Sequence, residues 1–136
     1  MKHIIITITL ALALATLTLS AKDLATCPDT GLTLSENLGV YTITGKSGAL
    51  VLGKKEAATR FFTEATKVFT KYTVNDIFSL DNSQYEVKSD DTGIYLIKVG
   101  LGAVKIRPAD AFYFKAYFTG EKIYNKGKKI WEVIKE

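Results

Sequence analysis

The stretch from Ile94 to Phe118 decides the predicted fold. It contains three apolar runs, Ile94-Tyr-Leu-Ile-Lys-Val99, Ala103-Val-Lys-Ile-Arg107 and Ala111-Phe-Tyr-Phe-Lys-Ala-Tyr-Phe118, separated by Gly-Leu-Gly and Pro-Ala-Asp. Such runs between short Gly and Pro breaks indicate consecutive antiparallel strands. The proline and aspartate before the last run would also suit a helix start. However, this run is apolar on nearly every side and rich in aromatic residues, which favours a strand.

The segment just upstream, Glu56–Tyr72, predicts a helix that covers one face of this sheet. Its apolar residues recur at the spacing of a single helical face, with Thr, Glu, Arg and Lys on the other side. Further upstream, Val40–Thr44 and Ala49–Leu52 flank the turn Gly45–Gly48 and predict a β-hairpin. The fold class is therefore α+β: an N-terminal hairpin and one long amphipathic helix packed on an antiparallel meander of four to six strands. No internal repeat is evident in the sequence.

The N-terminus has the layout of a secretory signal peptide. A short positive start is followed by an apolar run over residues 4–19, then by Ser20-Ala21 and the charged pair Lys22-Asp23. The run is slightly shorter than the roughly 20 residues of a membrane span. The expected organisation is a signal peptide at 1–21 and one exported domain at 22–136, with a flexible arm to about residue 38. The expected location is the periplasm or the medium.

Cys27 is the only cysteine, which excludes an intrachain disulfide. The preceding residues Leu24-Ala-Thr26 loosely resemble a lipoprotein cleavage box, so Cys27 is a possible lipidation site and an envelope lipoprotein is the alternative. Thr26 stands where a smaller residue is usual, and Lys22-Asp23 place charge between the apolar run and the cysteine. These two features favour the reading of Cys27 as a tolerated residue in the arm.

Catalytic patterns are weak in this chain. His3 is the only histidine and lies in the expected signal, so the exported part has no Ser-His, Cys-His or His-metal arrangement. Gly45-Lys46-Ser47 lacks the earlier glycine of a phosphate-binding loop and is followed by a strand pattern. The sequence therefore predicts a protein that is not an enzyme and needs no cofactor and no metal.

Charge provides the one pattern that suggests a function. Residues 72–97 carry one basic and five acidic side chains, whereas residues 98–136 carry nine basic and four acidic ones. In a strand, successive side chains point to opposite faces. This alternation assigns the core face to apolar side chains: Ile97, Val99, Val104, Ile106, Phe112, Phe114 and Phe118. The opposite face gathers the candidate binding residues Lys98, Lys105, Arg107, Tyr113, Lys115 and Tyr117, which Lys122, Tyr124 and Lys129 could extend.

Cationic and tyrosine side chains together suit an anionic partner, because lysine and arginine steer association and tyrosine gives contact area. An exposed sheet face is also commonly polar without any binding role. The function predicted is a small exported binding protein of the inhibitor, immunity or adaptor type. Its expected partner is a protein or an anionic envelope polymer, and export does not favour nucleic acid. The alternatives are a structural or lipid-anchored envelope component, with membrane contact only through Cys27 or a retained N-terminus, and a small-molecule carrier or enzyme with a helix–sheet cavity.

Overall fold

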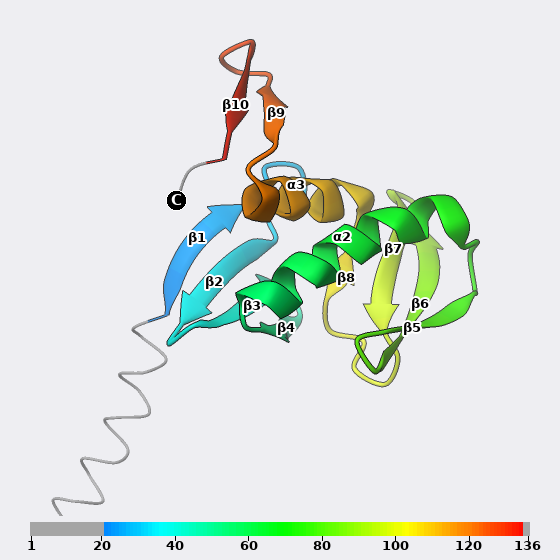
Figure 1. Ribbon diagram of the computed structural model, residues 1–136. Coiled ribbons are helices and arrows are strands. Elements are labelled where there is room, and N and C mark those ends of the chain that lie inside the picture. The colour runs from blue at the N-terminus through cyan, green and yellow to red at the C-terminus, as the bar shows by residue number, and fades with distance from the viewer. Residues whose placement is uncertain (1–20, 135–136) are drawn as a thin grey trace, which may run out of the picture.

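The computed structural model describes residues 21–134. The expected signal peptide therefore lies outside the described residues, apart from Ala21. The described part has an α+β fold with two helices and three antiparallel sheets, of four, four and two strands. Figure 1 shows the two four-stranded sheets near opposite ends of the longer helix and the two-stranded hairpin projecting away from the rest.

The first sheet is a four-stranded meander, where the sequence predicted only a hairpin. Its strands, in spatial order, are β1 (Lys22–Thr26), β2 (Thr33–Asn37), β3 (Val40–Gly45) and β4 (Gly48–Gly53). The predicted hairpin is present as β3 and β4. The expected arm instead contributes β1 and β2, because Leu24, Leu32 and Leu34 supply apolar side chains that are buried in the core.

Helix α2 (Lys55–Lys71) confirms the amphipathic prediction. The side chains of one stripe are buried: Ala58, Phe61, Phe62, Ala65, Thr66 and Val68. Glu56 in the first turn and Lys71 in the last turn complement the helix dipole. Three threonines of this helix, Thr59, Thr66 and Thr70, donate their hydroxyls to backbone carbonyls of the preceding turn. Packing on the apolar stripe, rather than intrinsic propensity, therefore holds this helix.

The second sheet is the meander β5 (Ile77–Leu80), β6 (Ser83–Asp90), β7 (Gly93–Lys98) and β8 (Lys105–Ile106). The strand predicted over residues 108–118 is wrong, because these residues form helix α3 (Pro108–Thr119). Pro108 occupies the first turn, and Asp110 Oδ2 accepts a hydrogen bond from the Arg107 backbone N–H at 2.8 Å. Gly120 then ends the helix in the left-handed conformation, with φ of 76°.

The predicted core face is accordingly correct only in part. Val104, Ile106 and Phe114 are buried, but Val99 is 42% exposed and Phe112 is 54% exposed. In β7 the buried residue is Leu96, which pairs with Ile106, so the predicted alternation of that strand is reversed. In a helix, Phe112 and Phe114 lie on different sides, whereas a strand would have put them on the same face.

The order of elements repeats: four antiparallel strands and a helix are followed by four antiparallel strands and a helix. In the hairpins β2–β3 and β6–β7, the fourth residue pair from the turn is buried, and each helix has a buried alanine and phenylalanine at the same distances from its N-cap. Each of these positions in the first half has a counterpart 53 residues later: Leu34 corresponds to Val87, Ile43 to Leu96, Ala58 to Ala111 and Phe61 to Phe114. The two halves share one architectural plan without an evident sequence repeat.

Aromatic side chains join the two halves. Phe62 of α2 lies 5.2 Å from Phe114 and 6.0 Å from Phe118, both in α3, measured between ring centroids. Phe61 lies 5.7 Å from Tyr85 of β6. The two helices thus pack on each other and on both sheets, which leaves the hairpin β9 (Lys122–Asn125) and β10 (Ile130–Val133) outside this core. Over residues 21–134, neither helix has the length and hydropathy that a membrane crossing needs.

Candidate functional site

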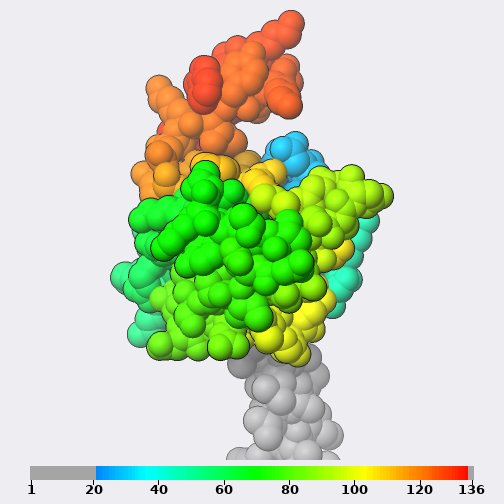
Figure 2. Space-filling model, turned by 90° about the vertical axis from the view of Figure 1, so that its right-hand side faces the viewer, coloured from blue at the N-terminus to red at the C-terminus, as the bar shows by residue number. Residues whose placement is uncertain are grey.

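A cleft of about 660 Å³ lies between the projecting hairpin, α3 and the loop that follows β1. Figure 2 shows this hollow between the hairpin, coloured orange to red, and the blue N-terminal loop. The N-terminal half of α3 contributes Ala109, Phe112 and Tyr113, and the loop contributes Cys27, Pro28 and Asp29. The hairpin and the residue after it supply the remaining lining: Ile123, Tyr124, Asn125, Lys126, Gly127, Lys128, Glu132, Val133 and Ile134.

The hairpin owes its shape to Asn125. The Asn125 backbone carbonyl accepts the Lys129 N–H at 2.7 Å, and its side-chain oxygen accepts the Lys128 N–H at 3.1 Å. The Asn125 amide then donates to Glu132 Oε1 at 2.8 Å. One residue therefore closes the turn and ties it to the opposite strand, which keeps a two-stranded sheet ordered although such a sheet is marginal by itself.

The two faces of the hairpin differ in exposure. Ile123 and Glu132 pair across the strands and are half-buried, whereas Tyr124 and Trp131 form the next pair and point the other way. Trp131 is 65% exposed and Tyr124 is 44% exposed, and their rings meet edge to face at 5.5 Å. Tyr124 reaches the edge of the cleft, while Trp131 lies outside it. The chain therefore exposes an aromatic pair beside the cleft.

Lysines surround this aromatic pair. Among the described residues, Lys122, Lys126 and Lys129 make no ion pair, and Lys128 Nζ lies 3.7 Å from Glu132 Oε1. An exposed pair of this kind contributes little, because water screens it and two flexible side chains must be held. The hairpin consequently presents positive charge to its surroundings.

A satisfied polar cluster joins the two elements that form one side of the cleft, the loop after β1 and the start of α3. Asp110 is fully buried and accepts hydrogen bonds from the Thr30 hydroxyl and the Arg107 N–H. Burial raises the pKa of the Asp110 carboxyl and also that of the Cys27 thiol. The Thr30–Asp110 bond joins residues 80 positions apart and fixes the loop after β1 against the start of α3. We therefore assign this cluster to shaping the cleft rather than to chemistry.

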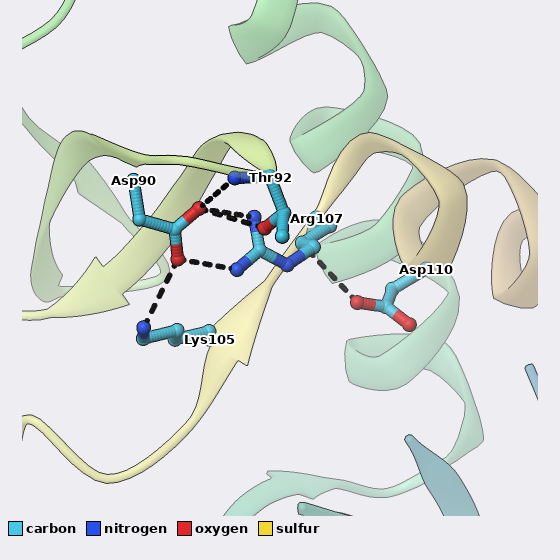
Figure 3. Close-up of polar contacts among 5 residues, drawn as sticks. All are labelled: Asp90, Thr92, Lys105, Arg107 and Asp110. Atoms are coloured by element: carbon cyan, nitrogen blue, oxygen red, sulfur yellow. Dashed lines mark hydrogen bonds and ion pairs between the residues drawn. The ribbon is translucent and has the colours of Figure 1, made fainter. Parts of the chain in front are cut away.

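Two of the predicted binding residues meet, and the single carboxylate between them offsets one of their two positive charges. Figure 3 shows Arg107 and Lys105 converging on Asp90, which also accepts hydrogen bonds from Thr92. Arg107 Nη2 lies 2.6 Å from Asp90 Oδ2, and Lys105 Nζ lies 3.1 Å from the same oxygen. Both cations also lie over the ring of Tyr95. The Arg107 guanidinium, followed by the Thr92 hydroxyl, holds the pKa of Asp90 well below its usual range.

The other four predicted residues lie elsewhere. Tyr113, Lys115 and Tyr117 belong to α3 rather than to a sheet, so they do not share a face with Lys105. Tyr113 lines the cleft, and Lys115 Nζ pairs with Glu121 Oε2 at 3.5 Å. Lys98 ends β7, where its backbone carbonyl accepts the N–H groups of the following turn. The predicted residues therefore do not share one face of a sheet.

Cys27, the possible lipidation site, is 1% exposed. Its backbone N–H donates to the Leu32 carbonyl at 2.9 Å, directly after β1. Lipoprotein processing leaves the modified cysteine at the new N-terminus, so it would remove β1 and bring the sulfur out of the core. The packing of β1 favours a cysteine that remains inside the fold.

Sequence patterns did not reveal the main recognition candidates, Phe112 and Trp131. The strand alternation assigns Phe112 to the core and gives Trp131 no role. The available signals were the hairpin turn Asn125–Lys128 and the residues Lys122, Tyr124 and Lys129, which had been named as an extension of the basic face. What the sequence lacked was any indication that this hairpin stands apart from both larger sheets.

Comparisons with known proteins add no family. No family model, no curated protein and no solved structure matches this chain.

Proposed function

We propose that this chain is a small exported binding protein, of the inhibitor, immunity or adaptor type, that docks an anionic protein partner through the hairpin β9–β10. The proposal rests on one observation above all: Trp131 is 65% exposed and stacks edge to face with Tyr124 on a hairpin that stands apart from the core.

Aromatic exposure of this kind fits recognition. Trp and Tyr are the side chains that most often dominate the binding energy of protein interfaces, because they bury a large area and lose little entropy. Val133, at 39% exposure, lies on the same face of the strand as Trp131 and extends the apolar surface there. A binding surface explains why these apolar side chains are exposed to water.

Charge fits an anionic partner. Lys122, Lys126 and Lys129 lie on the hairpin without ion pairs among the described residues. Positive charge around an apolar centre speeds association with a negative surface and disfavours positive ones. The predicted residues Lys105 and Arg107 are weaker candidates, because both already donate hydrogen bonds to Asp90.

The test is affinity capture from the host's own envelope and medium fractions, with the exported protein as bait at low and moderate salt. The variant Trp131→Ala with Tyr124→Ala removes the aromatic pair. The matched control is Val51→Ala, because Val51 is also 65% exposed but lies on β4. We expect a protein partner that the parent and the control retain and the double variant loses.

Two results would refute the proposal. One is a partner that the double variant retains as well as the parent, which would move the site away from the hairpin. The other is the absence of any protein captured at low salt. A companion variant, Lys105→Glu with Arg107→Glu, tests the originally predicted residues, and we expect it to retain the partner once its folding is verified by circular dichroism.

A further inference from the structure

We infer that the cleft beneath the hairpin binds an extended peptide segment of the partner, one with a large apolar side chain and with carboxylates at the end that meets the hairpin turn. This inference rests on the proposed function and specifies what that function recognises.

The lining of the cleft argues for an apolar side chain at its centre. Ala109 and Phe112 of α3 line the cleft, and Ile123 and Val133 of the hairpin add apolar lining. Phe112 is 54% exposed although α3 is the more apolar of the two helices within residues 21–134. An apolar group from a partner would remove this ring from water, at a gain of about 25 cal/mol for each Å² buried.

The size and shape of the cleft argue for a short segment rather than a broad surface. Its volume of about 660 Å³ lies within the range of pockets that hold drug-sized ligands. A folded surface or a bilayer would meet only the rim, because the hairpin overhangs the hollow (Figure 2). An extended chain can enter between the walls and leave at both ends.

Charges at the two rims set the direction of the segment. Lys126 and Lys128 line the cleft at the hairpin turn, whereas Asp29 lines it on the opposite wall. Carboxylates are therefore attracted at the turn and repelled at the loop after β1. Lys128 can exchange its partner Glu132 for a carboxylate of the ligand, because Lys128 is exposed and surface ion pairs are weak, while Glu132 keeps its hydrogen bond from Asn125.

The chain provides its own reporter for the test. Trp131 is the only tryptophan, so intrinsic fluorescence reports on the hairpin alone. The probe is the peptide Glu-Asp-Glu-Phe-Leu-Gly-Ser, capped at both ends and free of tryptophan. One comparison peptide replaces the three acidic residues with lysine, and a second replaces Phe-Leu with Ser-Ser.

We expect the acidic apolar peptide to change Trp131 fluorescence in a saturable way, and both comparison peptides to bind at least about tenfold more weakly. Lys126→Glu with Lys128→Glu should weaken binding of the first peptide by at least about tenfold. The matched control Lys54→Glu with Lys55→Glu makes the same change in charge at the start of α2 and should have no effect. Phe112→Ser should weaken binding without unfolding the chain, because Phe112 is exposed.

The inference is overturned if the lysine-containing peptide binds as well as the acidic one, or if the two pairs of lysine substitutions behave alike. It is also overturned if vesicles of phosphatidylglycerol change Trp131 fluorescence while none of the peptides does, since the hairpin would then favour a lipid surface. If no peptide binds but a partner is still captured through Trp131 and Tyr124, the inference about the cleft is refuted and the proposed function is not. If the parent protein captures no protein at low salt, both the inference and the proposed function are refuted.

Discussion

Arg107 and Asp90 form a two-pronged ion pair, in which Nη1 donates to Oδ1 at 3.1 Å and Nη2 donates to Oδ2 at 2.6 Å. Arg107 is the N-cap residue of α3, and Asp90 ends β6. The pair therefore anchors the start of the second helix to the second sheet. Fork-shaped pairs of this kind are more directional than single contacts between a lysine and a carboxylate.

Replacing Asp90 with Asn is expected to lower the melting temperature near neutral pH. The folded-state pKa of Asp90 is far below that of an unfolded aspartate, which is about 3.9. Its stabilisation is therefore fully present above about pH 4 and is lost as the pH falls toward the folded-state pKa. Thermal unfolding of both proteins from pH 7 down to about pH 3 should show the difference shrinking below about pH 4.

Asp91→Asn is the control for this comparison, because the neighbouring Asp91 is exposed and makes no ion pair among the described residues. Equal melting temperatures for the two variants at neutral pH would contradict the anchoring role of Asp90.

A comparison of two single variants, Phe114→Ala and Phe112→Ala, tests the helical conformation of residues 108–119. Phe114 is fully buried against Phe62, so its truncation is expected to cost about 3 to 5 kcal/mol of unfolding free energy. Phe112 is 54% exposed, and its truncation should cost less than about 1 kcal/mol. Urea titration followed by circular dichroism measures both. Similar large losses would indicate the strand conformation, in which the two rings share a face.

Tyr85→Phe is expected to reduce the loss of stability at alkaline pH. Burial raises the pKa of Tyr85 from its usual 10 to about 12. The unfolded chain releases this proton first, so stability falls as the pH rises from about 10 toward 12. The contribution of Tyr85 to this loss reaches about 1.4 kcal/mol by about pH 11.

Urea titrations between pH 8 and about pH 11 provide the measurement, and we expect the variant to have the shallower slope. Tyr124→Phe serves as the control for removing one tyrosine hydroxyl at the surface. Parallel slopes for the parent and Tyr85→Phe would count against this account.

Gly48→Ala is expected to destabilise the contact between the start of β4 and the loop that precedes β8. A Cβ atom at Gly48 would lie 2.8 Å from the Cβ of Ala103, and the backbone there has φ of 157°. We expect a loss of about 1 to 3 kcal/mol in urea titration. The double variant with Ala103→Gly should recover much of this loss, because the colliding methyl group is then absent.

Gly127→Ala is the matched control, since a Cβ there would have only one neighbour, the Asn125 side-chain oxygen at 3.4 Å. If Ala103→Gly restored nothing, the loss at Gly48 would have to come from backbone strain alone.

The sequence by itself determined the α+β class, the long helix and the turns of its hairpins. Helix α2 could be read from its residues because it covers the core with only one side, so apolar positions follow the helical period. The hairpin β3–β4 could be read because Gly45 and Gly48 bracket its turn. These signals are local, and each is complete within a few residues.

Only the tertiary structure decided that residues 108–119 form helix α3 rather than a strand, because the sequence shows no helical period there. Packing against α2 and the core buries Ala111, Phe114 and Ala116 and partly buries Tyr117 and Phe118, so apolar residues surround the helix axis and no period is visible. The recruitment of β1 and β2 likewise depends on apolar partners from other elements.

The candidate site also depends on contacts that the sequence could not supply. The lysines and tyrosines were visible, but their roles depended on distant residues: Asp90 neutralises Arg107 across 17 positions, and Thr30 meets Asp110 across 80. The cleft itself combines the loop after β1, helix α3 and the C-terminal hairpin, which only folding brings together. Charge and aromatic content are properties of the sequence, whereas their exposure and neutralisation are properties of the fold, because solvent access and ion pairing are set by neighbours in space.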